Sequence, residues 1–163
     1  MSKLENQSII SEKKTFSLDE QIRQAVLSLE PIWSAKNIDI DLNLPEISFY
    51  GNEDLIFQIW TNLISNGIKF TPSGGLVSVK MTAEDSFVNV VVADNGIGMT
   101  EEVQKHIFDK FYQAEGSRSM EGNGLGLTLV KKILSLCDGT IEVTSQPDLG
   151  SKFTVKPPVN CTT

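Results

Sequence analysis

Residues 77–94, VSVKMTAEDSFVNVVVAD, decide the fold class of this chain. Val77, Val79 and Met81 alternate with polar residues, and after a short polar turn a valine-rich run alternates over 88–94. Such alternation predicts two strands with one buried face each, joined as an antiparallel hairpin. Half-buried strands are typical of an antiparallel sheet that carries helices on one side, and they count against a doubly wound parallel sheet.

Helical and extended segments surround this hairpin on both sides. Residues 53–70 contain no proline and repeat apolar residues at helical spacing, which predicts a long amphipathic helix. We expect further helices over 18–33, from 100 and around 127–134, and extended segments at 38–44, 47–50, 141–145 and 152–156. The chain is therefore expected to fold as an α+β domain with helices stacked on one face of the sheet.

Composition and charge exclude several classes of function. The chain has 163 residues, with 14 Lys+Arg against 21 Asp+Glu, so its formal net charge is −7. This length suits one domain, and the acidic balance argues against general binding to nucleic acid. His106 is the only histidine, which excludes a His-rich metal site and any Ser/His/Asp hydrolase not built on it. No apolar run approaches the roughly 18 residues that span a bilayer, so we expect a soluble chain.

The first polar cluster lies on the long helix predicted over 53–70. Asn62, Asn66 and Lys69 have helical spacing and fall within an arc of about 60°. An amide oxygen is a neutral ligand suited to Mg²⁺, and a lysine one turn away can offset phosphate charge. The alternative interpretation is an ordinary solvated helix face.

The second cluster follows the hairpin directly. Asp94 shares the strand face of Val90 and Val92, so its carboxylate is predicted to point to the apolar side. A carboxylate there needs a hydrogen-bond donor, which an exocyclic amine such as adenine N6 supplies. Gly96 and Gly98 permit close approach of the backbone to a flat ring, although an Asp-Asn-Gly turn at a strand end is the alternative.

Two more segments carry candidate binding residues. The glycine-rich run 122–128 opens a predicted helix, where free N–H groups and the helix dipole favour an anion; a flexible hinge is the alternative. Residues 107–119 mix aromatic, charged and small residues and suggest a lid, or an ordinary surface loop. Lys110 and Arg118 are the lid cations able to reach phosphate.

These clusters occur in an order that resembles a known set of motifs. The sequence contains N-x-x-x-N-x-x-K-F-T from Asn62, D-x-G-x-G-M from Asp94, I-F-D-K-F from Ile107, G-x-G-L-G-L from Gly122 and G-S-x-F from Gly150. They resemble the N, G1, F, G2 and G3 boxes of two-component sensor histidine kinases over roughly residues 15–157. The wider family includes the type II topoisomerase, Hsp90 and mismatch-repair ATPases.

The resemblance implies a fold, cofactors and residue roles. The implied fold (the Bergerat ATP-binding fold) is a two-layer α/β sandwich: a mixed, mainly antiparallel sheet with three helices on one face, and a mobile ATP lid. The implied cofactors are ATP and Mg²⁺, with Asn66 as metal ligand and phosphoryl positioning by Asn62, Lys69 and Arg118. The implied ATP contacts are Asn62, Asn66, Lys69, Asp94, Gly96, Gly98, Phe108, Lys110, Phe111, Arg118, Gly122, Gly124, Leu125, Gly126, Leu127 and Ser151. Gln113 stands where the family often has a basic residue, which leaves phosphate clamping to Lys110 or Arg118.

One absence shapes the expected organisation. The family's phosphoacceptor, a histidine followed by an acidic residue, is missing, because His106 is followed by Ile107 within the lid motif. We expect residues 1–14 to be the end of a dimerisation helix or a linker, 15–157 the ATP-binding domain and 158–163 a tail. The implied partners are the histidine-bearing dimerisation domain of the same homodimeric protein and a response regulator receiver domain, in the cytoplasm, without nucleic acid or direct membrane contact.

Three alternative functions compete with the histidine kinase activity that the resemblance implies. An ATPase of the topoisomerase or Hsp90 type uses a glutamate where this chain has Asn62, whose amide cannot act as a general base. A serine kinase of the anti-sigma type is a second alternative. The third, from another class, is a module that senses nucleotide without catalysing any reaction.

Overall fold

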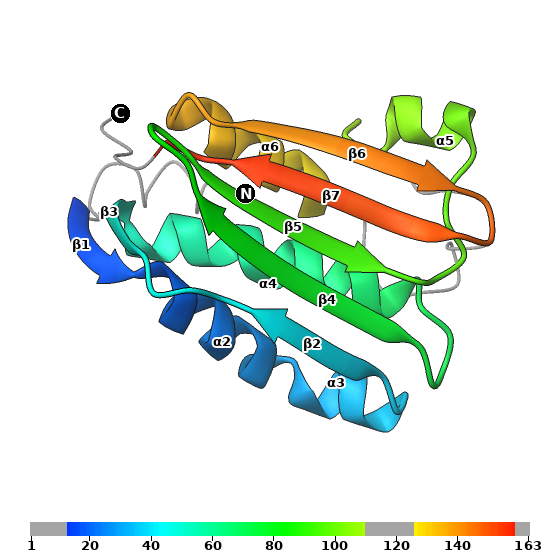
Figure 1. Cartoon of the computed structure of the whole chain (residues 1–163). Coiled ribbons are helices and arrows are strands. Elements are labelled where there is room, and N and C mark those ends of the chain that lie inside the picture. The colour runs from blue at the N-terminus through cyan, green and yellow to red at the C-terminus, as the bar shows by residue number, and fades with distance from the viewer. Residues whose placement is uncertain (1–12, 110–125, 159–163) are drawn as a thin grey trace.

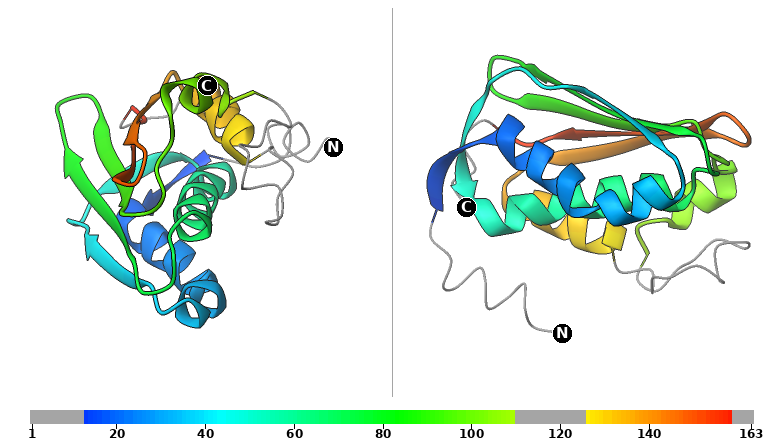
Figure 2. Two further views of the ribbon diagram at one scale, coloured as in Figure 1. Left: turned by 90° about the vertical axis from the view of Figure 1, so that its right-hand side faces the viewer. Right: turned by 90° about the horizontal axis from the view of Figure 1, so that it is seen from below.

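The computed structural model describes residues 13–109 and 126–158, which form two layers. The elements follow in the order β1 (Lys13–Ser17), α2 (Leu18–Ser28), α3 (Glu30–Ala35), β2 (Asp39–Asn43), β3 (Ser48–Asn52), α4 (Glu53–Lys69), β4 (Leu76–Ala83), β5 (Val88–Asp94), α5 (Glu101–His106), α6 (Gly126–Leu136), β6 (Thr140–Gln146) and β7 (Gly150–Lys156). Figure 1 shows the sheet crossing over α4, and Figure 2 shows the helices gathered on one face of the sheet.

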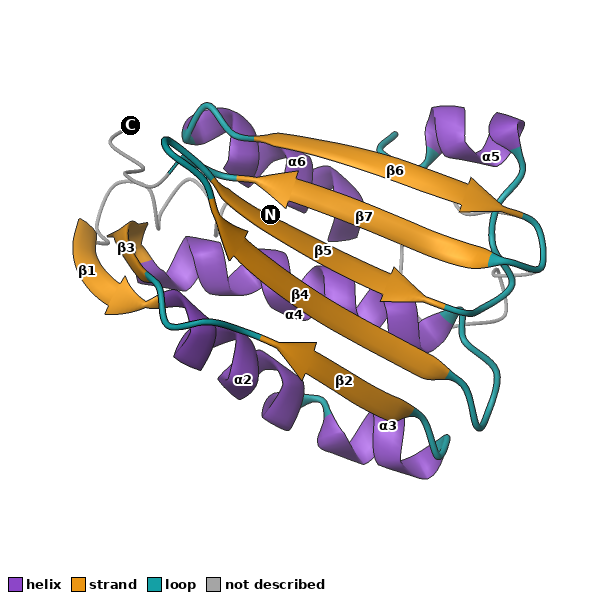
Figure 3. Cartoon of the chain, in the orientation of Figure 1, coloured by secondary structure: helices purple, strands orange, loops and turns teal. Residues whose placement is uncertain are grey.

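Within the described residues, the main sheet has five strands in the order β2-β4-β5-β7-β6. Strand β2 runs parallel to β4, and the remaining neighbours are antiparallel, as the colouring in Figure 3 makes easy to follow. The hairpin of β4 and β5 forms as predicted, with Val79 opposite Val92. The expected mixed, mainly antiparallel sheet with helices on one face is therefore confirmed.

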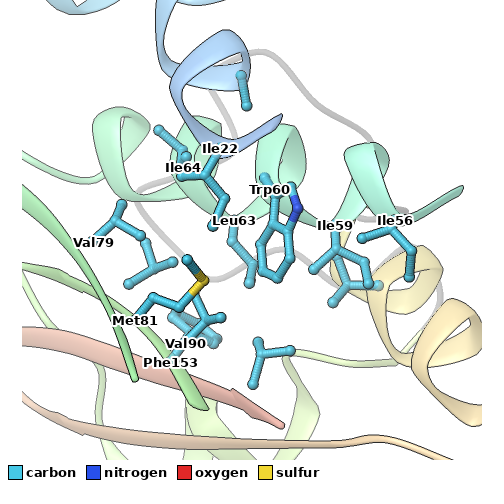
Figure 4. Close-up of a cluster of buried hydrophobic side chains, with 14 of the residues drawn as sticks. Ile22, Ile56, Ile59, Trp60, Leu63, Ile64, Val79, Met81, Val90 and Phe153 are labelled. Atoms are coloured by element: carbon cyan, nitrogen blue, oxygen red, sulfur yellow. The ribbon is translucent and has the colours of Figure 1, made fainter. Parts of the chain in front are cut away.

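Apolar side chains from both layers meet in a single core. Helix α4 contributes one fully buried stripe to it, and the sheet contributes the inward residues of β4, β5 and β7. Figure 4 shows Trp60 and Leu63 of α4 facing Met81, Val90 and Phe153 of the sheet. Burying a large side chain of this kind stabilises a fold by about 1.5–3 kcal/mol, so this layer contact fixes α4 firmly against β5.

Helix α4 begins and ends at recognisable signals. The Asn52 side chain accepts a hydrogen bond from the Leu55 N–H at 3.1 Å, which caps the first turn. At the other end, Lys36 Nζ donates to the carbonyl oxygens of Ile68 at 2.7 Å and Lys69 at 3.3 Å. A cation at a helix C-terminus also complements the helix dipole.

Two local details differ from the sequence prediction. The helix expected over 18–33 is split at Leu29, and Pro31 lies in the first turn of α3, where its missing N–H costs nothing. Strand β1 was not expected, and it pairs antiparallel with β3 as a separate two-stranded sheet, with Phe16 opposite Phe49. The folded part therefore includes Lys13 and Lys14, ahead of the start expected at residue 15.

Candidate functional site

Three polar side chains form a half-buried stripe along helix α4. Asn62, Asn66 and Lys69 lie beside the apolar face that faces the sheet, as their helical spacing predicts. The Asn62 side-chain amide donates to the Gln58 carbonyl oxygen at 2.6 Å, which leaves its own oxygen as an acceptor. Within the part of the chain that the structure describes, the Asn66 carboxamide makes no hydrogen bond, so its oxygen is available to a ligand.

Lys69 closes this stripe in the last turn of α4. Burial lowers the pKa of its ammonium group, and Nζ lies 5.3 Å from the centroid of the Phe70 ring. Among residues 13–109 and 126–158 it forms no ion pair with a carboxylate. Because Lys36 already serves the helix C-terminus, the charge of Lys69 remains available to an anion.

Asp94 ends strand β5 at the same end of the molecule. Its pKa is raised by burial, while hydrogen bonds from the backbone N–H groups of Gly96 and Ser151 partly oppose that rise. A Cβ atom added to Gly67 of α4 would lie 3.7 Å from Asp94 Oδ2, so helix and carboxylate are in direct proximity. The structure therefore brings the first and second sequence clusters together. It also confirms that Asp94 lies on the same strand face as Val90 and Val92.

Gly96 and Gly98 are required by the chain itself. A Cβ atom at Gly96 would collide with the Phe70 carbonyl oxygen, and one at Gly98 with that of Gln146. Gly98 also has a positive φ of 69°, which favours glycine. Close approach of backbone to backbone is thus the visible reason for both glycines, and their contact with a flat ring stays a prediction.

The start of helix α6 adjoins the polar stripe. A Cβ atom at Gly126 would lie 3.0 Å from Asn62 Oδ1, so the first residue of α6 packs against that amide. Thr128 Oγ1 donates to the Phe108 carbonyl oxygen at 2.9 Å, and Lys131 Nζ lies 5.3 Å from the centroid of the Phe108 ring. Phe108, Gly126 and Leu127 therefore gather around the beginning of α6. The predicted site residues Lys110, Phe111, Arg118, Gly122, Gly124 and Leu125 lie outside the described residues.

Ser151 lies beside Asp94 on the neighbouring strand. The two residues are directly paired between β5 and β7, which places their side chains on one face of the sheet. Ser151 Oγ is 2.9 Å from Ser145 Oγ of β6, and Ser145 was not among the residues singled out from the sequence. Its involvement depends on the register of β6 and β7, which no local motif reveals.

His106 and one pocket involve residues other than those of this stripe. His106 Nδ1 is 2.9 Å from Asp109 Oδ2 at the exposed end of α5, a partner that the sequence did not identify. A pocket of about 330 Å³ lies between the starts of α2 and α4 and is lined by Ser17, Glu20, Gln21, Gln24, Glu53, Asp54 and Phe57. This pocket lies near the start of α4, whereas Asn66 and Lys69 lie near the end of that helix.

The described residues form neither a cluster of metal-ligating side chains nor a membrane-spanning helix. In residues 13–109 and 126–158, no group of three or more His, Cys, Asp or Glu side chains could hold a metal ion. No helix among these residues is long and apolar enough to cross a membrane. The described site thus combines a partly desolvated carboxylate, free amide oxygens and a lysine cation.

Known proteins are similar to this chain along most of its length. A family model described as histidine kinase-, DNA gyrase B- and HSP90-like ATPase matches residues 51–160. The heme sensor protein HssS of Staphylococcus saprophyticus is 33% identical over 155 residues, covering 95% of this chain and 33% of HssS. The sensor histidine kinase RppB of Synechocystis is 31% identical over 163 residues, covering 98% of this chain and 36% of RppB. The chain spans about a third of the length of these two relatives.

Solved structures match the fold closely. The mycobacterial sensor histidine kinase MprB has the same fold, with a TM-score of 0.80, 22% identity and coverage of 93% of this chain and 100% of that one. The catalytic domain of the histidine kinase ThkA gives a TM-score of 0.80 with 26% identity, over 91% of this chain and 97% of that one. The chain belongs to the family of histidine kinase-, DNA gyrase B- and HSP90-like ATPases, and it is the ATP-binding catalytic domain of a sensor histidine kinase.

Proposed function

We propose that ATP binds where the second half of α4, the end of β5 and the start of α6 meet, and that its γ-phosphoryl group passes to a histidine outside this chain. In that transfer the bond between the γ-phosphorus and the β–γ bridging oxygen breaks, a phosphorus–nitrogen bond forms on the histidine, and ADP leaves. The acceptor is a histidine of a dimerisation domain in the same homodimeric protein. The phosphoryl group then goes to an aspartate of a response regulator receiver domain.

The observation that carries this proposal is the state of Asp94. The carboxylate is half-buried, its pKa is raised, and among the described residues its hydrogen bonds come from the backbone N–H groups of Gly96 and Ser151. A desolvated acceptor gains most from a further donor, and the 6-amino group of adenine is such a donor. Asp94 is therefore assigned to the adenine base.

The phosphate end of the nucleotide is assigned to the polar stripe of α4. Lys69 offers a cation that no carboxylate in the described residues neutralises. The N-terminus of α6, next to Asn62, offers its first backbone N–H groups and the positive end of a helix dipole. Phosphoryl transfer depends mainly on positioning and charge stabilisation, which these groups supply.

Mg²⁺ is assigned to Asn66. Its carboxamide oxygen is neutral and hard, carries no hydrogen bond in the described residues, and lies one turn from Lys69, which suits a cation that keeps most of its waters. When bound, Mg²⁺ neutralises part of the charge on the phosphates. Asn66 then orients the ion, while Asn62 and Lys69 position the phosphoryl group.

The remaining assignments depend on the sequence motifs. Arg118 is assigned to phosphoryl positioning, and Phe108, Lys110 and Phe111 to the lid that closes over ATP. Contacts to the nucleotide are assigned to Gly96, Gly98, Gly122, Gly124, Leu125, Gly126, Leu127 and Ser151. ATP is supplied in the cytoplasm, so we place the domain there.

A competing assignment as a hydrolase is disfavoured by Asn62. Hydrolysis needs a group that takes a proton from water, and an amide cannot do so. The Asn62 side-chain nitrogen moreover donates to the Gln58 carbonyl oxygen, which fixes the amide as a hydrogen-bonding group. A purely nucleotide-sensing module remains the second candidate, since the described residues supply binding groups only.

One experiment separates these functions. We expect the chain to bind ATP in calorimetric titration, more tightly with Mg²⁺ than without it, and to take no label from γ-labelled ATP. Adding a separate histidine-bearing dimerisation fragment from a sensor kinase should give an acid-labile label on the fragment. A fragment whose acceptor histidine is replaced by glutamine is the control. ATP binding without any transfer would favour the sensing module, and steady phosphate release by the chain alone would favour the hydrolase.

A further inference from the structure

Three polar residues form a row across neighbouring strands. Asp94 of β5 is paired with Ser151 of β7, and Ser151 is paired with Ser145 of β6. Directly paired residues in an antiparallel sheet point to the same face, so all three side chains lie on the face that the helices cover. The next row along the same strands is Val92, Phe153 and Val143, which belong to the core or pack against it.

The hydroxyl group of Ser145 has three neighbours and only one proton. It accepts a hydrogen bond from the Met99 N–H at 2.8 Å and donates to the Gly150 carbonyl oxygen at 2.9 Å. A serine hydroxyl has one O–H donor and two lone pairs. With its proton given to the Gly150 carbonyl oxygen, Ser145 Oγ has one lone pair left for its third contact, at 2.9 Å, and the Ser151 hydroxyl is then the donor.

This hydrogen-bond count decides what Ser151 can offer to a ligand. Its only proton is committed to Ser145, so Ser151 Oγ presents lone pairs to any group on its other side. Asp94, next to it, is likewise an acceptor when ionised. The row thus presents acceptors alone to whatever binds beside it.

We propose that Ser145 is a positioning residue that sets purine selectivity by holding the Ser151 hydroxyl proton away from the base. This inference rests on the proposed function, because it takes adenine as the group beside Asp94. Adenine carries an amino group at position 6, which donates to acceptors. Hypoxanthine carries a carbonyl oxygen there, which meets two acceptors and is rejected.

The surroundings of Ser145 are fixed well enough for this role. Gln104 Nε2 donates to the carbonyl oxygens of Met99 at 3.1 Å and Ser145 at 3.0 Å, which ties α5, the loop after β5 and strand β6 together. A Cβ atom at Gly150 would collide with the Asp94 carbonyl oxygen, so the turn before Ser151 sits tightly against β5. These contacts hold the Ser145 backbone and the Gly150 carbonyl group in place beside the end of β5.

Titration of the Ser145→Ala chain with ATP and with inosine triphosphate tests the proposal. Without Ser145 Oγ, the Ser151 hydroxyl is free to turn and donate to the 6-oxo group. We expect the preference for ATP over inosine triphosphate to fall about fivefold, the worth of one ordinary hydrogen bond. Ser145→Thr keeps the hydroxyl and should keep the preference. Ser28→Ala, which removes a hydroxyl that bonds the Ala25 carbonyl oxygen on α2, is the matched control.

A double-substitution cycle makes the outcome specific to the Ser151 proton. In a Ser151→Ala background, Ser145→Ala should leave the preference unchanged, because no hydroxyl remains to be turned. Ser145→Cys keeps the side-chain size with much weaker hydrogen bonding, and it decides the matter if the alanine variant does not fold. An unchanged preference in Ser145→Ala, or equal weakening of both nucleotides, would overturn this inference alone. If the unsubstituted chain bound neither nucleotide, the proposed function itself would fail.

Discussion

The polar groups at the two ends of helix α4 differ in whether they have hydrogen-bond partners within the chain. At the first turn, Asn52 caps the helix, and the buried Gln21 side chain donates to the Glu53 carbonyl oxygen at 2.9 Å while accepting from Trp60 Nε1 at 2.7 Å. Lys14 Nζ pairs with Glu53 Oε1 at 2.8 Å. Donors and acceptors are matched inside the chain at this end.

In the last turns of α4 the backbone carbonyl groups have hydrogen-bond partners, but two polar side chains do not have polar side-chain partners among the described residues. Lys36 satisfies the final carbonyl oxygens, but the Asn66 amide and the Lys69 ammonium have no polar side-chain partner within the described residues. Asp94 nearby keeps a raised pKa. Burial of polar groups is costly unless they are paired. We therefore propose that one end of the helix contributes to stability and that a ligand completes the other.

The largest effect is expected from Asp94→Asn at the ligand end. The substitution removes the charge from the acceptor and offers an amide to the adenine amine, so ATP affinity should fall about 100-fold. Calorimetric titration measures it. Asp41→Asn, on the exposed face of β2, is the control and should bind ATP as before. Equal affinity in Asp94→Asn would remove the adenine assignment.

Asp19→Asn tests the first of these two ends. Like Asp94, Asp19 is a carboxylate at least partly removed from water, but it has side-chain as well as backbone hydrogen-bond donors within the chain. Burial raises the pKa of Asp19, but hydrogen bonds from Ser17, Arg23 and the Ile47 N–H outweigh it, and the pKa falls to about 2. We expect a loss of about 2 kcal/mol in the free energy of unfolding at pH 7, with ATP affinity unchanged.

The lowered pKa of Asp19 also predicts how the free energy of unfolding changes with pH. The carboxyl group has a pKa of about 3.9 in the unfolded chain. Because the pKa of Asp19 is lower in the folded chain, its ionised carboxylate stabilises the fold fully at a pH above about 3.9. This stabilisation is lost as the pH falls from about 4 towards about 2. Urea unfolding of the wild type and Asp19→Asn should converge over this range. Asp39→Asn, exposed on β2, should show no such convergence.

Asn66→Ala should have a smaller effect that depends on magnesium. Loss of one neutral ligand is expected to weaken ATP binding about tenfold in Mg²⁺ and much less in its absence. Titration with and without Mg²⁺ measures the difference, and Asn43→Ala, exposed at the end of β2, is the control. The same weakening under both conditions would contradict the assignment of Asn66 to the metal.

Gly67→Ala should give the smallest change, in the stabilising direction. The added Cβ atom would lie 3.6 Å from Val77 Cγ1, an ordinary contact, and alanine is the better helix former by up to about 1 kcal/mol. Thermal unfolding should therefore shift upwards. Gly74→Ala is the contrast, because Gly74 has open space but a φ of 85°, and that substitution should destabilise the fold. A destabilised Gly67→Ala chain would mean that the helix cannot accept even a methyl group beside Asp94.

Local patterns predicted most of the fold but could not place its long-range contacts. The alternation over 77–94 was enough for β4 and β5, and the helical period for α4, since both are properties of neighbouring residues. Strand β1 was missed because its partner β3 follows only after two helices and strand β2. The break at Leu29 was missed because the apolar spacing continues through it.

The same distinction between local patterns and long-range contacts applies to the candidate site. The inward direction of Asp94 follows from a period of two, and the common stripe of Asn62, Asn66 and Lys69 follows from helical spacing. The proximity of Gly126 to Asn62 and the role of Ser145 depend on how distant elements pack. A serine with no surrounding motif has no sequence signal, so only the structure could bring it forward.

The edge strands of the main sheet affect how this domain behaves at high protein concentration. Among the described residues, strands β2 and β6 each have one unpaired side, and such edge strands can pair with strands of other molecules. Asp39 and Asp41 of β2 and Glu142 of β6 are exposed there, and like charges on approaching copies repel. Salt screens such repulsion, so the domain should self-associate through these strands more readily at high ionic strength.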